Sequence, residues 1–275
     1  MRGDNTVLAD DGHRVGYQVR KAPGERSPVL VFLPALGVPL SYYSRLLDVL
    51  AGGDRTVIGV EHRGQPMSPI RGRFGYADMV RRDLPAVFAL PEVREASHVL
   101  LVGHSMGGAL ALLSTAAGLV APDALVTIAT GTSWCGAEFG AWRRIRRFAA
   151  IRTVRGVTRM LGYWPGHRLG FAGRQPSTVM RDWAYEASHG RFRLHRDPFD
   201  YEAALATLTT PRLMLGIEGD DLINPRAVAL LARRAAGADR AHVAPAGGPR
   251  MNHFSWARHA PAEVAGSIDR WLVGL

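Results

Sequence analysis

The chain has 275 residues, a length that suits one large α/β domain with a single substantial core. Its formal net charge is +10 and 47% of its residues are hydrophobic, but no apolar run approaches the roughly 18 residues that a membrane-spanning helix needs. We therefore expect no membrane span.

The positive charge does not by itself indicate a nucleic-acid-binding protein. Almost all basic residues are arginines, with Lys21 the only lysine. The sequence has no zinc-finger spacing, no RNP-like aromatic strand and no basic helix with heptads. We therefore expect no nucleic-acid partner.

Two further features bear on the cellular setting. The N-terminal stretch "MRGDNTVLADDGHRV" has Asp and Gly where a secretory signal carries its apolar segment, which predicts a cytoplasmic protein. The single cysteine, Cys135, can form neither an internal disulfide nor a cysteine-based zinc site, so we expect it to be a packing residue.

In chain order, residues 6–20 predict a β-hairpin that turns at Asp11-Gly12. Short apolar runs then alternate with longer helix-like segments, the pattern of a mostly parallel sheet with helices on both faces. The expected strands are residues 28–34, 56–64, 98–103, 123–130, 212–219 and 240–246. The expected helices include residues 41–51, 76–90 with a possible kink at Pro85, 106–118, and 261–275 with Pro261 in the first turn.

Residues 134–200 are too long for an ordinary crossover between two strands. They hold 13 arginines against five acidic residues, a net +8, and four of the six tryptophans. Because long structureless loops are rare inside compact domains, we expect a helical insertion with its own surface. Residues 1–133 and 201–275 would then form one core domain.

Ser105 interrupts an apolar run in "VLLVGHSMGGALALL", residues 99–113. Gly103 and Gly107 flank it in a G-x-S-x-G pattern, after a predicted strand and before a predicted helix, which is the context of a nucleophilic serine on a sharp turn. Small residues are needed because the turn brings strand and helix into close contact. The alternative is a passive serine in a glycine-rich turn.

A serine nucleophile needs a base and an acid that orients the base. After the strand at 212–219, the loop "GDDLINP" supplies Asp220 and Asp221, although either could instead cap the helix that starts near Asn224. Near the end of the chain, His253 is the candidate base. His259 competes with it, but its place beside the last helix favours a surface role. The order serine, acid, histidine supports the catalytic interpretation.

These motifs resemble those of the α/β-hydrolase fold, and the similarity runs through nearly the whole chain. "GHSMGG" resembles the family's nucleophile elbow. "EHRGQPMS" at 61–68 is similar to its D-x-R-G-x-G-x-S segment, with Glu61 for Asp and Pro66 for the second Gly. "GDDLINP" resembles its G-x-x-D-x-x-x-P loop, and that spacing puts the family's acid on Asp221.

Three longer stretches look like a narrower set of capped bacterial proteins described only as predicted hydrolases of unassigned substrate. They are "LPALGVPLSYYSRLL", "LGFAGRQPSTVMRDWA" and "MNHFSWAR". The resemblance implies a mostly parallel eight-stranded sheet flanked by helices, with residues 134–200 as a helical cap over the serine. Where the family has an H-G-x loop, this chain has Pro34-Ala35-Leu36-Gly37. The resemblance implies that the backbone N–H groups of Leu36 and Met106 bind the oxyanion.

The function that the resemblance implies is a serine hydrolase that cleaves a carboxylic ester, thioester or lactone through an acyl-serine, with Ser105, Asp221 and His253 as the triad. Such chemistry requires no metal or other cofactor, and the sequence has no GxGxxG or P-loop. Two alternatives stay open: an acyltransferase that uses the same acyl-enzyme, and a non-catalytic or lyase-like member that only binds ligand.

For the substrate pocket we expect His104, Trp134, Trp183 and Phe254, which would suit an apolar or aromatic small-molecule acyl group. The arginines of residues 134–200, above all "RRIRR" at 143–147, could steer an anionic coenzyme A or carrier-protein thioester. The simpler alternative is an arginine-rich surface that only contacts solvent.

Overall fold

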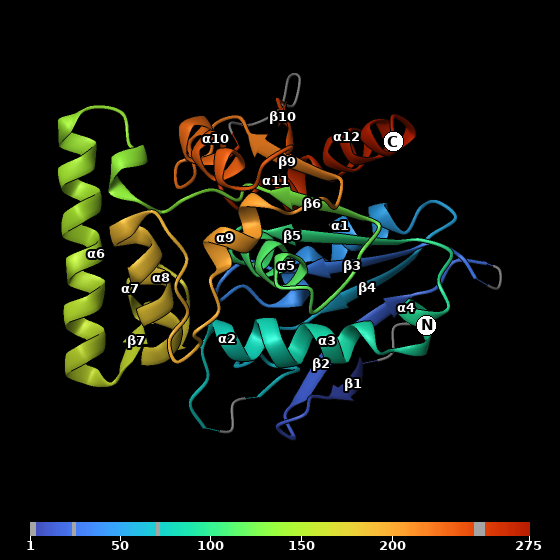
Figure 1. Ribbon diagram of the computed structural model, residues 1–275, viewed down its shortest axis with the longest axis horizontal. Coiled ribbons are helices and arrows are strands. Elements are labelled where there is room, and N and C mark those ends of the chain that lie inside the picture. Colours follow the sequence, from blue (N-terminus) through green and yellow to red (C-terminus); the bar gives the residue numbers. More distant parts are fainter. Residues whose placement is uncertain (1–3, 24–25, 70–71, 245–250) are drawn as a thin grey trace.

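The computed structural model describes residues 4–23, 26–69, 72–244 and 251–275. Eight strands form its central sheet: β1 (Asp4–Leu8), β2 (Arg14–Arg20), β3 (Val29–Leu33), β4 (Thr56–Val60), β5 (Val99–His104), β6 (Ala124–Ile128), β9 (Arg212–Ile217) and β10 (Asp239–Val243). Their order is β1-β2-β4-β3-β5-β6-β9-β10 (Figure 1). Every neighbouring pair from β4 to β10 is parallel, while β1 and β2 join as antiparallel strands. The predicted mostly parallel sheet is confirmed.

The strand sequences explain this arrangement. All five residues of β3, β4 and β6 are buried, as expected for parallel strands that helices cover on both faces. The predicted hairpin is confirmed, with Val7 opposite Val15 and Gly12 at φ +79° in the turn. β10 ends at Val243, and residues 245 and 246 of its predicted range lie outside the described residues.

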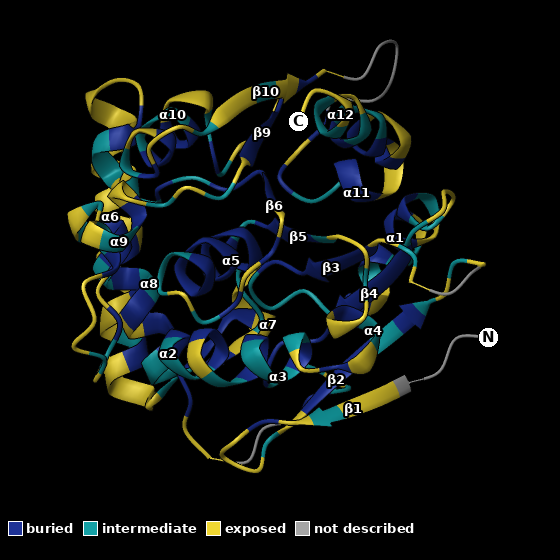
Figure 2. Cartoon of the chain, turned by 45° about the vertical axis from the view of Figure 1, so that its right-hand side comes forward, coloured by how far each residue is buried: buried dark blue, intermediate teal, exposed yellow. Residues whose placement is uncertain are grey.

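Helices cover both faces of the sheet. One core lies between the sheet and α2 (Tyr76–Asp78), α3 (Leu84–Phe88), α5 (Met106–Ala116) and α10 (Pro225–Arg234). The other core lies beneath α1 (Ser44–Leu50), α11 (Trp256–His259) and α12 (Pro261–Val273). The remaining helices of the core region are α4 (Pro91–Arg94) and α9 (Tyr201–Ala206). Figure 2 shows α5 dark blue along its length, because residues 106–115 are all buried.

The helical segment around Pro85 is continuous but widened. Residues Met79–Asp83 form a π-helical turn between α2 and α3, and Pro85 lies in the first turn of α3. Proline cannot donate the backbone hydrogen bond of a regular helix, and a widened turn just before it accommodates that loss. The expected disturbance at Pro85 therefore takes the form of a π-helical turn.

The segment between β6 and α9 lies beyond one end of the strands of the sheet (Figure 1). It comprises α6 (Ala141–Leu161), β7 (Tyr163–Pro165), α7 (Gly166–Leu169), β8 (Arg174–Pro176) and α8 (Ser177–His189). The predicted helices are present. The antiparallel pair of β7 and β8 was not expected, because three-residue strands leave no periodic pattern in the sequence. None of the helices in the described ranges is long and apolar enough to span a membrane.

Candidate active site

Ser105 occupies the sharp turn between β5 and α5. Its backbone has φ +53° and ψ −115°, a conformation that residues with a side chain rarely adopt. Its N–H donates to Ile128 O at 2.9 Å, which ties the turn to the neighbouring strand β6. The surrounding sheet therefore holds Ser105 in a strained conformation at the end of the central strand.

The glycines on either side are required by space. A Cβ atom on Gly103 would lie 2.4 Å from the carbonyl carbon of Gly107, and one on Gly107 would lie 2.4 Å from Leu33 O. Both contacts are with backbone, which cannot rotate away. The G-x-S-x-G spacing thus reflects close packing of β5, α5 and β3 around the serine.

His253 approaches Ser105 from the loop before α11. Its Nε2 lies 2.9 Å from Ser105 Oγ, although the two residues are 148 positions apart. Trp256 Nε1 donates to His253 O at 2.9 Å and fixes the backbone of the loop. The other ring nitrogen, Nδ1, lies 2.8 Å from Asp220 Oδ2. In the tautomer that satisfies both contacts, Nδ1–H donates to Asp220, and Nε2 accepts the hydroxyl proton of Ser105.

We expected Asp221 to contact the imidazole of His253, and the structure places Asp220 there instead. Asp221 is exposed, and its Oδ1 accepts the backbone N–H of His253, at 3.4 Å, and not a ring N–H. Asp220 Oδ1 accepts the N–H groups of Leu222 and Ile223, both at 2.8 Å, and this local turn points its other oxygen at the imidazole. Spacing alone could not distinguish two adjacent aspartates in a turn.

The helix cap and the second histidine also have defined places in this region. Neither aspartate caps α10, because the N-cap is Asn224, whose side chain accepts the N–H of Ala227. His259 is exposed at the end of α11, while His253 is the histidine beside Ser105. His259 therefore has the surface position that its sequence context favoured.

Leu36, in the loop after β3, lines the same cavity as Ser105 and Met106. Met106 is the first residue of α5, so its N–H has no acceptor within the helix. Across the described ranges, no hydrogen-bond acceptor is found for the Leu36 N–H either. The two N–H groups that the family resemblance assigns to the oxyanion thus have no acceptor among the described residues.

Two buried side chains hold this loop, and sequence reasoning missed both. Tyr43 OH accepts the N–H of Ala35 at 3.1 Å and lies 2.7 Å from His104 Nδ1. His62 Nε2 lies 2.8 Å from Pro34 O and donates to it. Burial lowers the pKa of His62 to about 4, so the imidazole is neutral and keeps one N–H for this bond. These contacts fix a loop that lacks the usual His-Gly.

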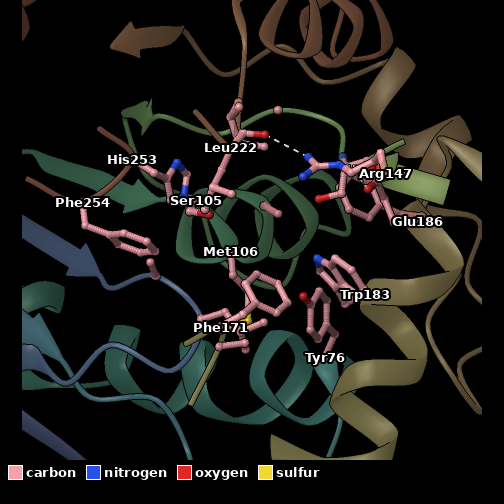
Figure 3. A pocket seen from close by; sticks show the side chains of 18 residues that line it. Tyr76, Ser105, Met106, Arg147, Phe171, Trp183, Glu186, Leu222, His253 and Phe254 are labelled. Carbon is pink, nitrogen blue, oxygen red and sulfur yellow. Dashed lines mark hydrogen bonds between the residues drawn. The ribbon is translucent and has the colours of Figure 1, made fainter. Parts of the chain in front are cut away.

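A cavity beside Ser105 is lined mainly by apolar and aromatic side chains. Figure 3 shows Ser105 and His253 on one wall, with Tyr76, Phe171 and Trp183 across from them. Trp183 and Phe254 both line this cavity, where the sequence placed them. The segment that contains α6 and α8 also contributes to the wall of this cavity, through Phe171, Trp183 and Glu186 among others.

Two expected pocket residues lie elsewhere. His104 is fully buried behind the serine, in edge contact with Trp256 and bonded to Tyr43, and burial lowers its pKa well below the ordinary value. Trp134 is 37% exposed and packs against Gly136 and Gly190, away from the cavity. A strand residue next to the serine points to the opposite side of the sheet from it, which is why His104 cannot reach the pocket.

Arg147 and Glu186 add polar groups to the cavity wall, and the sequence assigned only Arg147 a possible role, in steering an anion. Arg147, from the "RRIRR" run, donates to Ser133 O at 3.2 Å and to Leu222 O at 2.8 Å, and so ties α6 to the loop that carries Asp220 (Figure 3). Glu186 accepts from the Ser133 N–H at 2.8 Å and pairs with Arg234. Burial raises the pKa of the Glu186 carboxyl.

The chemistry available here is that of protein side chains. In the described ranges, no three His, Cys, Asp or Glu side chains are grouped in a way that could hold a metal ion. The arrangement of hydroxyl, imidazole and carboxylate can activate an alcohol.

Comparison with known proteins shows the family of the chain. Residues 30–267 match the profile of the alpha/beta hydrolase family. The chain belongs to that family. Membership supports hydrolase activity in general. No curated protein sequence matches the chain significantly.

Solved structures of low sequence identity share the fold over nearly the whole chain. The esterase EaEST from Exiguobacterium antarcticum has a TM-score of 0.69 at 16% identity, with 98% of this chain and 99% of that one covered. Alpha/beta hydrolase domain-containing protein 10 from mouse has a TM-score of 0.67 at 15% identity, with 99% of each chain covered. Est1E from Butyrivibrio proteoclasticus, with ferulic acid bound, has a TM-score of 0.67 at 12% identity, with 98% of each covered.

Proposed function

We propose that this hydrolase-family protein is a serine hydrolase that acts through an acyl-serine, with Ser105 as nucleophile, His253 as base and Asp220 as the orienting acid. The observation that carries the proposal is the chain of two contacts, 2.9 Å from Ser105 Oγ to His253 Nε2 and 2.8 Å from His253 Nδ1 to Asp220 Oδ2. The strained backbone of Ser105 supports it as well, because such strain persists where the surrounding structure imposes it and clusters at functional sites.

The mechanism follows from these positions. His253 Nε2 takes the hydroxyl proton as Ser105 Oγ attacks the substrate carbonyl, and Asp220 stabilises the imidazolium that forms. The N–H groups of Leu36 and Met106 bind the developing oxyanion. Protonated His253 then gives its proton to the leaving group, which departs and leaves the acyl-serine. A water molecule, deprotonated by His253, attacks the acyl carbonyl, and the carboxylic acid is released with Ser105 regenerated.

The cavity indicates the class of substrate. Aromatic side chains from Tyr76, Phe171, Trp183, Phe192 and Phe254 line it. Such a wall favours an apolar or aromatic acyl group in a small-molecule ester, thioester or lactone. We further propose that residues 134–200 act as a cap over the serine, because this segment supplies much of the cavity wall.

A turnover assay tests the proposal. Acid release would be followed in a pH-stat with aryl esters, simple acyl thioesters and lactones, for the wild type, Ser105→Ala and Ser133→Ala. Ser133 lines the same cavity but contributes only backbone groups to the contacts described above, so it is the matched control. We expect Ser105→Ala to lose turnover by at least a thousandfold and Ser133→Ala to stay within a few-fold of wild type. Full turnover in Ser105→Ala would contradict the proposal.

A further inference from the structure

A second cavity, about 510 Å³ in volume, lies between α6 and α8. α6 contributes Arg152, Arg155, Thr158 and Arg159, and α8 contributes Arg181 and Tyr185. Because Trp183 and Glu186 of α8 line the cavity beside Ser105, the two cavities touch opposite faces of this helix. We call the second cavity the arginine groove. Its volume falls in the range of small-molecule binding sites.

The arginine groove is strongly cationic, and none of the described residues in its wall is acidic. Arg152, Arg155 and Arg159 are spaced so that they share one side of α6. In the part of the chain that the structure describes, none of these three nor Arg181 has a carboxylate partner within 4.0 Å. Other arginines of the same helix do have a carboxylate partner, since Arg143 and Arg147 both pair with Glu138. The Arg181 guanidinium contacts the His195 ring, at 2.8 Å from its Nε2, so the other three guanidinium groups carry most of the groove's free positive charge. Like charges around one concavity repel each other and attract an anion.

A buried hydroxyl gives a second, independent sign of a ligand. Thr158 is 5% exposed and lines the groove, and its Oγ1 has no hydrogen-bond partner within the described residues. A threonine inside a helix commonly donates to the carbonyl one turn before it, but Thr158 does not. Burying a hydroxyl without a partner is unfavourable, and because Oγ1 is itself covered, it can bond a ligand oxygen in the groove once the side chain turns toward it.

We propose that the arginine groove binds a diphosphate group. Guanidinium groups form paired hydrogen bonds that match phosphate oxygens, and a diphosphate carries enough negative charge for several of them. A single carboxylate would leave most of the positive charge uncompensated. The Thr158 hydroxyl supplies one further hydrogen bond. Because the groove lies on the far side of α8 from Ser105, this proposal does not depend on the acyl-serine chemistry.

Calorimetric titration with inorganic pyrophosphate at physiological salt tests the site. It would use the wild type, the double variant Arg155→Gln/Arg159→Gln and the control Arg226→Gln/Arg233→Gln. The control removes the same charge from exposed positions on α10. We expect the groove variant to bind at least tenfold more weakly than wild type and the control to change less than twofold. Equal weakening in both variants, or no binding by the wild type, would overturn the proposal in favour of an adventitious attraction of anions to a basic protein.

The variant Thr158→Val distinguishes a specific binding site from diffuse charge attraction, because it removes the hydroxyl and keeps the size and charge of the side chain. We expect at least a threefold loss of affinity for pyrophosphate. Unchanged affinity would overturn the proposal of a specific site. Circular dichroism and thermal unfolding would establish that each variant is folded. A parallel titration with coenzyme A identifies the source of the diphosphate. If coenzyme A binds more tightly than pyrophosphate and the groove variant loses this binding, the ligand is a nucleotide-type carrier. If the two ligands bind with equal affinity, the ligand is a free diphosphate. Repeating the titrations on Ser105→Ala keeps the result independent of turnover.

Discussion

Asp220 Oδ2 lies 2.8 Å from His253 Nδ1, while the adjacent Asp221 meets this histidine only at its backbone N–H. An acid that holds the imidazole in the correct tautomer is worth about 10⁴ in rate in enzymes of this kind. We therefore predict that Asp220→Asn lowers kcat/KM by about 10⁴ and that Asp221→Asn changes it less than about tenfold. Steady-state kinetics with an activated ester measures both. The reverse order of effects would show that the loop rearranges to use Asp221.

Tyr43 connects the loop after β3 to the nucleophile turn, since it accepts the Ala35 N–H and contacts His104. Tyr43→Phe leaves that buried N–H without a partner, which costs about 1–3 kcal/mol of unfolding free energy. We expect kcat to fall about tenfold with little change in KM, because the Leu36 donor loses its support. Urea unfolding and kinetics test this, with Tyr42→Phe, whose ring contacts Arg258, as the matched control. Equal effects of the two variants would contradict a specific role for Tyr43.

His62 gives the protein a defined response to acid. Its folded-state pKa, about 4, is below the ordinary value of 6.5, so the unfolded chain binds this proton more readily than the folded one. The free energy of unfolding therefore falls as pH drops from 6.5 towards 4, by at most about 3 kcal/mol from this group. His62→Gln keeps an N–H donor for Pro34 O but does not titrate, so its stability should vary less over this window. Urea unfolding at several pH values measures the slope. The exposed His98→Gln is the control, and an unchanged slope in His62→Gln would contradict the assignment.

We predict opposite effects on stability for alanine substitutions at two glycines, Gly107 and Gly156. A Cβ on Gly107 would lie 2.4 Å from Leu33 O, so we expect Gly107→Ala to lose about 3 kcal/mol of stability or more. Gly156 is an exposed helix residue of α6 with no atom within 4 Å of its potential Cβ. Gly156→Ala should stabilise the protein by about 0.5–1 kcal/mol, because alanine favours the helix. Thermal unfolding compares them, and a stable Gly107→Ala would contradict the close packing at the turn.

Much of the fold was predictable because its strands are short, buried apolar runs. β3, β4 and β6 could be predicted for that reason. The turn at Ser105 could also be predicted, because its close packing requires glycine at positions 103 and 107. The π-helical turn before Pro85 and the pairing of β7 with β8 were not predictable. They depend on tertiary contacts and leave no periodicity in a few residues.

The sequence predicted part of the candidate site's geometry. Ser105 and His253 could be named from their places after strands, whereas the choice of Asp220 over Asp221 depends on backbone hydrogen bonds that fix which side chain turns inward. Tyr43 and His62 act through buried bonds to the backbone of a loop, and no motif in the sequence encodes those bonds.

Covalent labelling tests most directly whether Ser105 is an activated nucleophile. Intact-mass analysis after exposure to a fluorophosphonate would be run on the wild type, Ser105→Ala and Asp220→Asn. We predict one adduct on the wild type, none on Ser105→Ala and much slower labelling of Asp220→Asn. Folded wild-type protein that takes up no adduct, or an adduct that persists in Ser105→Ala, would contradict an activated Ser105.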